Sequence, residues 1–345
     1  MRSRRPRSAA GRSPEGEAGV SSPALFAGID LGGTKILVLI ADASGHVLGS
    51  ARVATLASQG PEPVFGRIAD AVREAAADAA VAVADVQVAG VSAPGPIDLE
   101  EGIITDPPNL PGWHNVPLAR ILHDRLGMRV YLENDANAAG VGEHQFGAGR
   151  GFRHMIYVTI STGIGGGIII DNELYIGTSG AAGEVGHIGV AASGPTCGAG
   201  HVGCLEAFAS GTAIAARARE AIAQGRMPRT ARIAEHNPPL SAETVYLAAE
   251  QGEAEAAEII AAAGRYLGIG LASLVNVFNP QAIVLGGGLT NMGDAIMGPA
   301  VETARTRSFA QSFMDVRIIE GELGDRAAAL GALAVARIRD ARRAS

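Results

Sequence analysis

The sequence has 345 residues, a little over twice the roughly 150 residues of a common domain, so two domains are expected. Hydrophobic residues make up 47% of the chain and aromatic residues 4%. This composition predicts aliphatic cores and excludes a disordered chain, a collagen-like repeat and an aromatic platform for nucleic acid. The two cysteines are too few for a disulfide scaffold and indicate a reducing cytoplasm.

Charge is unevenly distributed along the chain. Residues 1–12 carry five arginines and no acidic residue, which leaves 28 − 5 = 23 basic against 35 acidic groups in the remainder. The acidic remainder argues against nucleic-acid binding, because it repels phosphate backbones. Residues 1–23 are expected to form a disordered basic tail without the apolar stretch of a secretory signal. No run reaches the roughly 18 apolar residues that a membrane span needs.

The ordered part is expected to begin near Ala24 with three short strands joined by glycine-containing turns. These strands cover residues 24–30, 35–42 and 46–53. A helix over 62–84 and buried strands over 86–93 and 129–134 follow. Strands that alternate with helices predict an α/β fold in which helices cover a sheet.

A similar pattern recurs in the second half of the chain. Strands predicted at 154–160, 168–171 and 173–177 flank a glycine-rich turn at 161–167. A helical stretch, a buried strand that ends in glycines and a last helix follow at 242–278, 281–289 and 325–343. Two similar units, each with a glycine-rich turn, predict an internally duplicated, two-lobed α/β protein with a ligand between the lobes.

The segment Asp30-Leu-Gly-Gly-Thr-Lys35 lies between two predicted strands. Its glycines let backbone N–H groups approach a phosphate, and the Thr34 hydroxyl and Lys35 ammonium add donors. The segment matches neither the Walker loop nor the dinucleotide fingerprint, and taken alone it is equally well a tight turn with Asp30 as a turn-forming carboxylate. Lys35 is the only lysine among 28 basic residues, which favours a crowded position where a guanidinium would not fit.

Two further glycine-rich segments extend this pattern. Residues 161–167 (Ser-Thr-Gly-Ile-Gly-Gly-Gly) would face the first turn across the two lobes and suit a polyphosphate chain. Residues 285–289 (Leu-Gly-Gly-Gly-Leu) offer a flat surface for an adenine ring, or are a strand end capped by flexible glycines.

Acidic residues follow a strand at Glu133-Asn134-Asp135. Asp135 is either the N-cap of the next helix or a catalytic acid at the carboxyl end of a strand, where such groups lie in open α/β sheets.

A loop rich in histidine, cysteine and glutamate follows the second glycine turn. His187, Cys197 and Cys204 have the spacing of a metal site but supply three ligands, whereas structural zinc requires four. His201 is either the fourth ligand or a solvated loop histidine. Glu184 and Glu206 flank the loop and are interpreted as acceptors for substrate hydroxyls.

Eight motifs in this order resemble the ROK (repressor, open reading frame, kinase) family over residues 24–335. The motifs are DLGGTK at 30–35, VSAPGPID at 91–98, PPNLPGW at 107–113, ENDANAA at 133–139, STGIGGG at 161–167, GEVGH at 183–187, the Cys-to-Glu segment that ends at 206 and LGGGL at 285–289. The resemblance implies a two-lobed actin/hexokinase-like (ribonuclease H-like) ATPase fold and ATP-dependent phosphorylation of a hexose at its 6-hydroxyl, with D-glucose as the first candidate. Fructose, mannose, N-acetylmannosamine and N-acetylglucosamine are alternative substrates.

The resemblance also assigns roles to individual residues of this sequence. It implies that Asp135 is the general base and that Asp30 helps to hold Mg²⁺ through water. The residues implied to bind the sugar are Asn109, Asn134, Asp135, Glu184, His187 and Glu206. Those implied to bind ATP are Gly32, Gly33, Thr34, Lys35, Thr162 and Gly163 at the phosphates and Gly286 and Gly287 at the adenosine.

The sequence departs from the family pattern in the metal loop. The family loop has the form C-x-C-G-x-x-G-C-x-E, and Ala199 stands at the position of the middle cysteine. Zinc bound by His187, Cys197 and Cys204, with water or His201 as a fourth ligand, is therefore expected to be held more weakly than in a site with three cysteines.

The expected small lobe comprises residues 24–134 and the last helix at about 325–345. The expected large lobe comprises residues 135–324, including a metal- and sugar-binding loop at 183–206. The resemblance further implies a cytoplasmic homodimer or dimer of dimers. A sugar-responsive transcriptional regulator is the second candidate, but it would need a helix-turn-helix region of some 70 residues, and only 29 residues precede Asp30.

Overall fold

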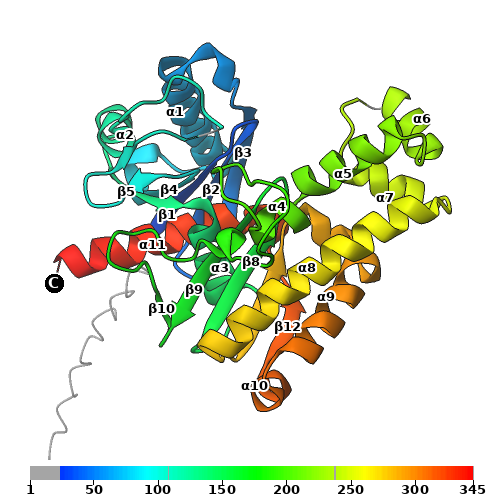
Figure 1. The fold of residues 1–345 in the computed structure, drawn as a ribbon. Coiled ribbons are helices and arrows are strands. Elements are labelled where there is room, and N and C mark those ends of the chain that lie inside the picture. Colours follow the sequence, from blue (N-terminus) through cyan, green and yellow to red (C-terminus); the bar gives the residue numbers. More distant parts are fainter. Residues whose placement is uncertain (1–23, 108, 237, 345) are drawn as a thin grey trace, which may run out of the picture.

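The computed structural model describes residues 24–107, 109–236 and 238–344. The predicted basic tail at 1–23 lies outside these residues. Within the described ranges the chain forms two five-stranded sheets, a two-stranded hairpin and helices that cover the sheet faces (Figure 1).

The first sheet has the strand order β3-β2-β1-β4-β7. Strands β1 to β3 form an antiparallel meander, and β4 and β7 run parallel to β1. Strand β1 is buried on both faces, which explains its nearly continuous apolar sequence. The five strands are β1 (Leu25–Leu31), β2 (Lys35–Asp42), β3 (Val47–Ala54), β4 (Val86–Ala93) and β7 (Arg129–Asn134).

The second sheet repeats this arrangement with the order β10-β9-β8-β11-β12. Strands β8 to β10 are antiparallel neighbours, and β11 and β12 run parallel to β8. The same order and the same directions in both sheets confirm the predicted internal duplication. The five strands are β8 (Met155–Ile160), β9 (Ile164–Ile170), β10 (Glu173–Leu174), β11 (Ala282–Gly286) and β12 (Arg317–Glu320).

The second glycine turn is shorter than predicted. Strand β9 already begins at Ile164, so that Gly165 and Gly167 belong to the strand. A Cβ atom on Gly165 would lie 2.9 Å from the Ala136 side chain, and one on Gly167 would lie 3.0 Å from the Ala136 carbonyl oxygen. Glycine is required here because the helix that begins at Asp135 packs directly on the strand backbone.

Other predicted elements differ from the structure at their ends. The helix predicted over 62–84 ends at Asp78. The helical stretch predicted at 242–278 is interrupted near Gly252, which has a φ of +87°, a left-handed conformation that glycine adopts without strain. The helices are α1 (Pro61–Asp78), α2 (Leu118–Leu126), α3 (Asp135–Phe146), α4 (Leu205–Ala209), α5 (Gly211–Ala223), α6 (Pro228–His236), α7 (Ala242–Glu250), α8 (Ala254–Phe278), α9 (Asp294–Arg307), α10 (Ala310–Asp315) and α11 (Ala327–Ala344). Shorter elements are the hairpin strands β5 (Ile97–Asp98) and β6 (Ile103–Ile104) and the 3₁₀ turns η1 (Ala57–Gln59), η2 (Val83–Asp85), η3 (Val185–His187), η4 (Gly288–Met292) and η5 (Gly324–Arg326).

Helices α3 and α11 cross between the two sheets (Figure 1). Helix α3 packs on β8 and β9, whereas α11 packs on β1, β4 and β7. Their contact depends on small residues, because a Cβ atom on Gly331 would lie 1.6 Å from the Ala138 carbonyl oxygen and one on Gly142 would lie 2.2 Å from the Ala327 carbonyl oxygen. The two backbones therefore touch at this crossing.

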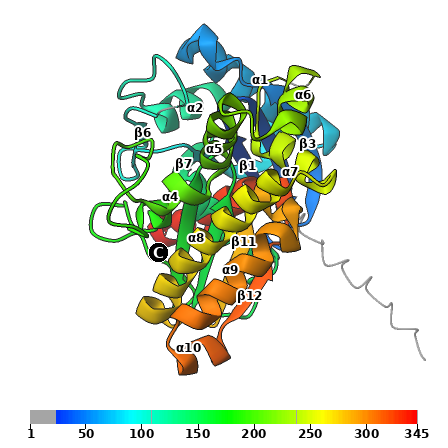
Figure 2. The same cartoon turned by 45° about the vertical axis from the view of Figure 1, so that its right-hand side comes forward.

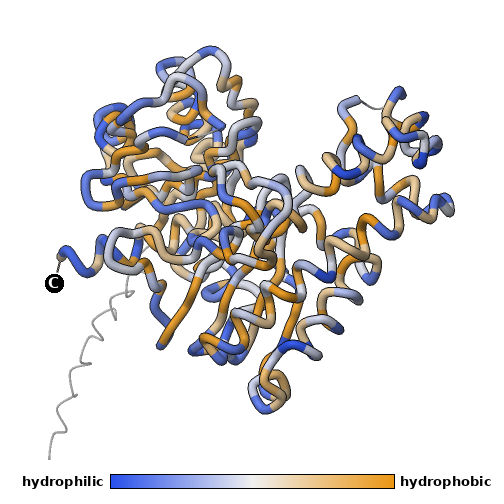
Figure 3. Tube along the Cα trace, viewed as in Figure 1, coloured by the Kyte–Doolittle hydropathy of each residue, from blue (hydrophilic) through white to orange (hydrophobic). Residues whose placement is uncertain are grey.

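Buried apolar side chains form two large clusters, one on each sheet. Figure 3 colours the chain by the hydropathy of each residue. The cluster of the second sheet is built around α8, which lies beside α9 (Figure 2). Helix α8 is long and apolar enough to cross a membrane by length and composition alone, but 61% of its most apolar window is buried inside the protein. This burial identifies α8 as a core helix of the fold.

Candidate active site

The turn between β1 and β2 has the compact geometry that the glycines predict. The N–H of Gly32 donates to the carbonyl of Lys35 at 3.0 Å, and the Thr55 hydroxyl donates to the carbonyl of Gly32 at 2.6 Å. A Cβ atom on Gly33 would lie 3.0 Å from the Asn109 carbonyl oxygen. The turn is therefore held from outside by Thr55 and packs closely against the loop that carries Asn109.

Lys35 lies at the first position of β2, beside an acidic residue from the other end of the chain. Its Nζ is 3.7 Å from a carboxylate oxygen of Asp325, which Arg52 also approaches at 2.5 Å. These two cations hold the pKa of Asp325 below its usual value, so that this carboxylate is ionised at neutral pH. The Lys35 ammonium thus has a weak ion-pair partner and is 45% exposed.

The turn between β8 and β9 is the counterpart of the first turn in the second sheet. The N–H of Ser161 donates to the carbonyl of Gly163 at 2.9 Å, and the Thr212 hydroxyl donates to the carbonyl of Thr162 at 2.8 Å. The Glu206 carboxylate accepts a hydrogen bond from the N–H of Ile164 at 3.1 Å. Glu206 is thereby fixed at the second glycine turn.

Asp135 is the first residue of α3 and not its N-cap. Asn134 is the N-cap, and its side-chain oxygen accepts from the N–H groups of Ala136 and Asn137 at 3.0 and 3.2 Å. The alternative interpretation of Asp135 as the cap is therefore wrong. Because Asn134 caps the helix, Asp135 does not have to. One of its carboxylate oxygens accepts from the N–H of Ala136 at 2.8 Å, and the other is available to a ligand.

Two acidic residues, Glu184 and Asp30, interact electrostatically with Asp135. The Asp135 side chain is accessible to solvent, yet the protein around it displaces enough water to raise its pKa, and the charge of Glu184 raises it further. Loss of hydration raises the pKa of Asp30 to about 6, against a hydrogen bond from Ser92 at 3.0 Å and with a further increase from the charges of Asp135 and Asp325. A concentration of negative charge of this kind favours a bound cation.

The loop at 183–206 carries Glu184, whose charge acts on Asp135, and also the two cysteines. Glu184 is followed by η3, in which the His187 Nε2 lies 3.9 Å from a Glu184 carboxylate oxygen. The other ring nitrogen of His187, Nδ1, lies 3.6 Å from the Cys197 sulfur. One ring nitrogen of His187 therefore lies near Glu184, which is predicted to bind the sugar, and the other lies near Cys197.

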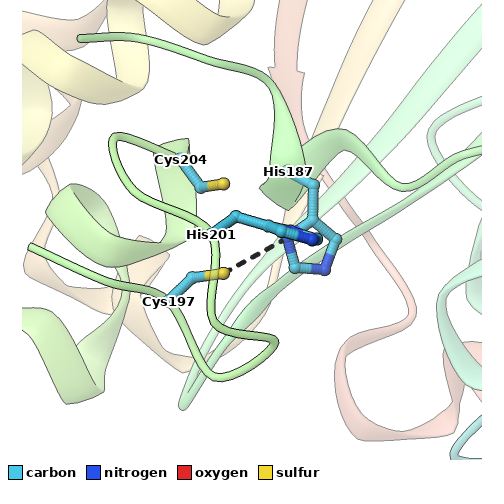
Figure 4. A group of neighbouring side chains, drawn as sticks. All are labelled: His187, Cys197, His201 and Cys204. Carbon is cyan, nitrogen blue, oxygen red and sulfur yellow. Dashed lines mark hydrogen bonds between the residues drawn. The ribbon is translucent and has the colours of Figure 1, made fainter. Parts of the chain in front are cut away.

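His201 joins the predicted metal ligands. His187, Cys197, His201 and Cys204 each offer one ligand atom, and these atoms all lie within 4.8 Å of one another (Figure 4). A tetrahedral zinc ion separates its sulfur and nitrogen ligands by roughly 3.3–3.8 Å, so small side-chain rotations would close the site. The set of two thiols and two imidazoles fits zinc. His201 lies where it could supply the fourth ligand, in place of water.

Gly286 and Gly287 lie at the end of β11 against strand β8. A Cβ atom on Gly286 would lie 2.3 Å from the Tyr157 hydroxyl, and one on Gly287 would lie 2.4 Å from the Ile160 carbonyl oxygen. These glycines therefore allow a close approach of β11 to β8.

Three residues at the site had no predicted role. Ser92 bonds to Asp30, Thr55 holds the first turn, and Asp325 pairs with Lys35. Ser92 lies within the VSAPGPID motif and could have been identified there. Asp325 has no local signal, because it is 290 positions away from Lys35 (325 − 35) in the sequence.

Comparisons with known proteins identify the family of this chain. The model of the ROK family matches residues 26–339. A glucokinase from Thermotoga maritima is 36% identical over 89% of this chain and 96% of its own length. A xylose repressor from Caldicellulosiruptor bescii is 32% identical over 89% of this chain and 77% of its own length.

Solved structures show the same fold. A ROK hexokinase from Thermus thermophilus has a TM-score of 0.80 and 35% identity, with 92% of this chain and 99% of that chain covered. A ROK family glucokinase from Streptomyces griseus, in complex with glucose and AMPPNP, has a TM-score of 0.77 and 34% identity, with 91% and 100% covered. The predicted actin/hexokinase-like fold is thus confirmed, and the chain belongs to the ROK family.

Proposed function

We propose that this protein is an ATP-dependent hexose kinase that phosphorylates the 6-hydroxyl of D-glucose. The observation that carries this proposal is the position of Asp135, whose accessible carboxylate lies at the start of α3 within the electrostatic reach of Asp30 and Glu184. The similarity to glucokinases over nearly the whole chain supports glucose as the substrate.

In the proposed reaction, Asp135 accepts the proton of the sugar 6-hydroxyl as that oxygen attacks the γ-phosphorus of ATP. The bond between the γ-phosphorus and the bridging oxygen of ADP breaks, and glucose 6-phosphate and ADP are released. The raised pKa of Asp135 suits this step, because a base with a higher proton affinity is a better acceptor as long as it remains ionised. Positioning and charge stabilisation supply most of the catalysis in phosphoryl transfer.

The other polar residues of the site would hold the two substrates. We assign Asn109, Asn134, Glu184, His187 and Glu206 to the sugar hydroxyls. Gly32, Gly33, Thr34 and Lys35 in the first turn and Thr162 and Gly163 in the second would contact the phosphates, and Gly286 and Gly287 would contact the adenosine. Mg²⁺, held through water by Asp30, would neutralise charge on the transferred phosphate.

The proposal is tested by an ADP-release assay with Mg-ATP and a panel of glucose, mannose, fructose, N-acetylmannosamine and N-acetylglucosamine. Glucose is expected to give the highest kcat/KM. A better substrate in the panel would change the assignment of the sugar but not of the reaction. Sugar binding without ADP release would favour a sugar-responsive regulator instead.

Asp135→Asn tests the role of the base. The amide retains the shape of the carboxylate but accepts no proton, so kcat should fall by about 10²–10⁴-fold while glucose affinity, measured by calorimetry, changes little. Asp124→Asn is the matched control, because Asp124 is an exposed carboxylate on α2. A near-normal kcat in Asp135→Asn would contradict the proposed role.

We also propose a structural zinc ion bound by His187, Cys197, His201 and Cys204. Zinc would fix His187 and Glu206 for the sugar, since the glycine-rich loop has few side chains of its own to order it. Protein purified without chelator should contain about one equivalent of zinc, and less than about half an equivalent would exclude the site.

His201 distinguishes this site from a three-ligand site completed by water. His201→Ala should weaken zinc binding in competition with a chromogenic chelator and lower the temperature of unfolding. His236→Ala is the control, since His236 is exposed and bonds to the Arg232 carbonyl on α6. Equal zinc affinity in both variants would show that water is the fourth ligand.

The remaining predictions concern the larger organisation. We propose that residues 24–134 with the last helix form a small lobe and residues 135–324 a large lobe, and that the protein is a cytoplasmic homodimer or dimer of dimers without a nucleic-acid partner. Light scattering of the purified protein tests the oligomeric state.

A further inference from the structure

The strand that leads to Asp135 is an edge strand. Strand β7 pairs with β4 on one side and has no strand neighbour on the other within the described sheet. Edge strands are held by fewer backbone hydrogen bonds than central strands. A residue that must be placed accurately at the end of β7 therefore needs support from outside the sheet.

The end of helix α11 supplies this support. Arg129, Tyr131 and Glu133 alternate along β7 and so share one face, and all three contact α11. Asp340 accepts from Arg129 at 2.6 Å and from the Tyr131 hydroxyl at 3.1 Å. Arg339 contacts the part of the strand nearest to Asp135.

Arg339 makes two hydrogen bonds with its guanidinium. Its Nη2 donates to a Glu133 carboxylate oxygen at 2.6 Å, and its Nη1 donates to the carbonyl of Leu132 at 2.8 Å. The second bond gives the edge strand a hydrogen bond to a backbone carbonyl, of the kind that a neighbouring strand would otherwise make. A planar guanidinium makes the two bonds from two different nitrogens, an arrangement that the single nitrogen of an ammonium group does not reproduce.

Glu133 passes this contact on to the catalytic segment. Its side chain is 1% exposed, and its second carboxylate oxygen accepts from the N–H of Asn134 and from the Asn137 side-chain amide, each at 3.1 Å. Asn134 in turn caps α3. An unbroken series of hydrogen bonds therefore runs from Arg339 through Glu133 to the residues on both sides of Asp135.

A buried ion pair is a poor device for stability alone. Burial raises the pKa of Glu133, and the Arg339 charge opposes this increase. Apolar residues of similar volume in such a place are often as stable or more stable, because the desolvation of both charges offsets their attraction. What the pair provides in addition is a fixed geometry directly behind the catalytic segment.

We propose that Arg339 is a positioning residue that acts through Glu133 to hold Asn134 and Asp135 in their reactive arrangement. The inference rests on the proposed function of Asp135. Without Arg339, the buried Glu133 carboxylate has no cation beside it, and its bonds to Asn134 and Asn137 rearrange. A displacement of about 1 Å at a catalytic group costs on the order of 10²-fold in rate.

The experiment compares Arg339→Met with Asp340→Asn. Both variants remove contacts between α11 and β7, and both are expected to lower the temperature of unfolding. Only Arg339→Met is expected to lower kcat for glucose phosphorylation, by about 10–100-fold, with a smaller change in the KM for ATP. Arg339→Lys keeps the charge but not the double hydrogen bond, so its kcat should lie between those of Arg339→Met and the unchanged protein.

Hydrogen exchange provides a readout that does not depend on kinase activity. Amide exchange over residues 132–137 should accelerate in Arg339→Met and in Arg339→Lys, and stay near the normal rate in Asp340→Asn. If Arg339→Met does not fold, the same comparison is made with Arg339→Lys.

Two results would overturn the inference. One is an equal kcat for the Arg339 and Asp340 variants when both are folded. The other is unchanged exchange over 132–137 in the Arg339 variants. A protein that is inactive with every sugar but shows the expected exchange would contradict the proposed function and leave the positioning of this segment by Arg339 intact.

Discussion

Replacing Gly331 with alanine would place a methyl group at the crossing of α3 and α11. The added Cβ would lie 1.6 Å from the Ala138 carbonyl oxygen and 2.8 Å from the Gly142 backbone nitrogen. Non-bonded carbon contacts are comfortable only near 3.5 Å. The two helices would therefore have to separate by roughly 2 Å, because every atom that clashes belongs to a backbone.

The expected cost follows from this separation. Overpacking of a tight contact costs about 1–3 kcal/mol, and here the upper part of that range applies since no flexible side chain can move aside. The better helix propensity of alanine returns about 1 kcal/mol. A net loss of about 2 kcal/mol corresponds to a decrease of about 3 °C in the temperature of unfolding of a chain of this length.

Activity should decrease as well. Ala138 is one helical turn from Asp135 on α3, so a shift of the crossing moves the carboxylate by about 1 Å and lowers kcat by about 10²-fold. The assay is steady-state ADP release with glucose, combined with thermal unfolding of the same samples.

Gly66→Ala is the matched control. Gly66 lies inside α1, and the nearest atom to an added Cβ is 3.9 Å away, at the end of the flexible Arg125 side chain. This variant should be as stable as the unchanged protein or more stable by up to about 1 kcal/mol, with normal kcat. An unchanged unfolding temperature in Gly331→Ala would refute the packing argument, and a lower temperature with normal kcat would refute its link to the base.

Three further predictions concern the site. Lys35→Arg should raise the KM for ATP and lower kcat more than it affects glucose binding, because a guanidinium is wider and more directional than an ammonium beside the glycine turn; unchanged kinetics would make Lys35 a bystander. Burial raises the pKa of Asp30 from 3.8 to about 6, so the folded protein retains a proton that the unfolded chain has released. In magnesium-free buffer the free energy of unfolding of the unchanged protein, relative to that of Asp30→Asn, should therefore fall as the pH rises from about 4 to 6 and level off above; a difference independent of pH would contradict this. Ala199→Cys should raise zinc affinity in chelator competition and the heat resistance of activity, because a third thiolate in place of the His201 imidazole adds negative charge opposite Zn²⁺; no change in either would show that a side chain at position 199 does not reach the metal.

The sequence allows much of the fold to be predicted, since its strands are apolar and its turns contain glycine. The predicted first turn at Gly32 and Gly33 is confirmed as a hairpin between β1 and β2. Contacts between residues distant in the sequence have no such signal. Loop spacing does not say which residues fold back onto a site, so the sequence alone does not decide whether His201 is a metal ligand. The pairing of Glu133 with Arg339 depends on the path of α11 across the sheet, which no local pattern contains.

The crossing of α3 and α11 has a consequence for how the protein folds. Helix α3 follows the last strand of the first sheet but packs on the second, and α11 follows the last strand of the second sheet but packs on the first. The two halves of the chain thus exchange their final helices, and each half without the other leaves an apolar sheet face uncovered. The halves should accordingly unfold in one cooperative transition, and a cut in the loop after α3 should leave two fragments that stay associated and separate only when both unfold.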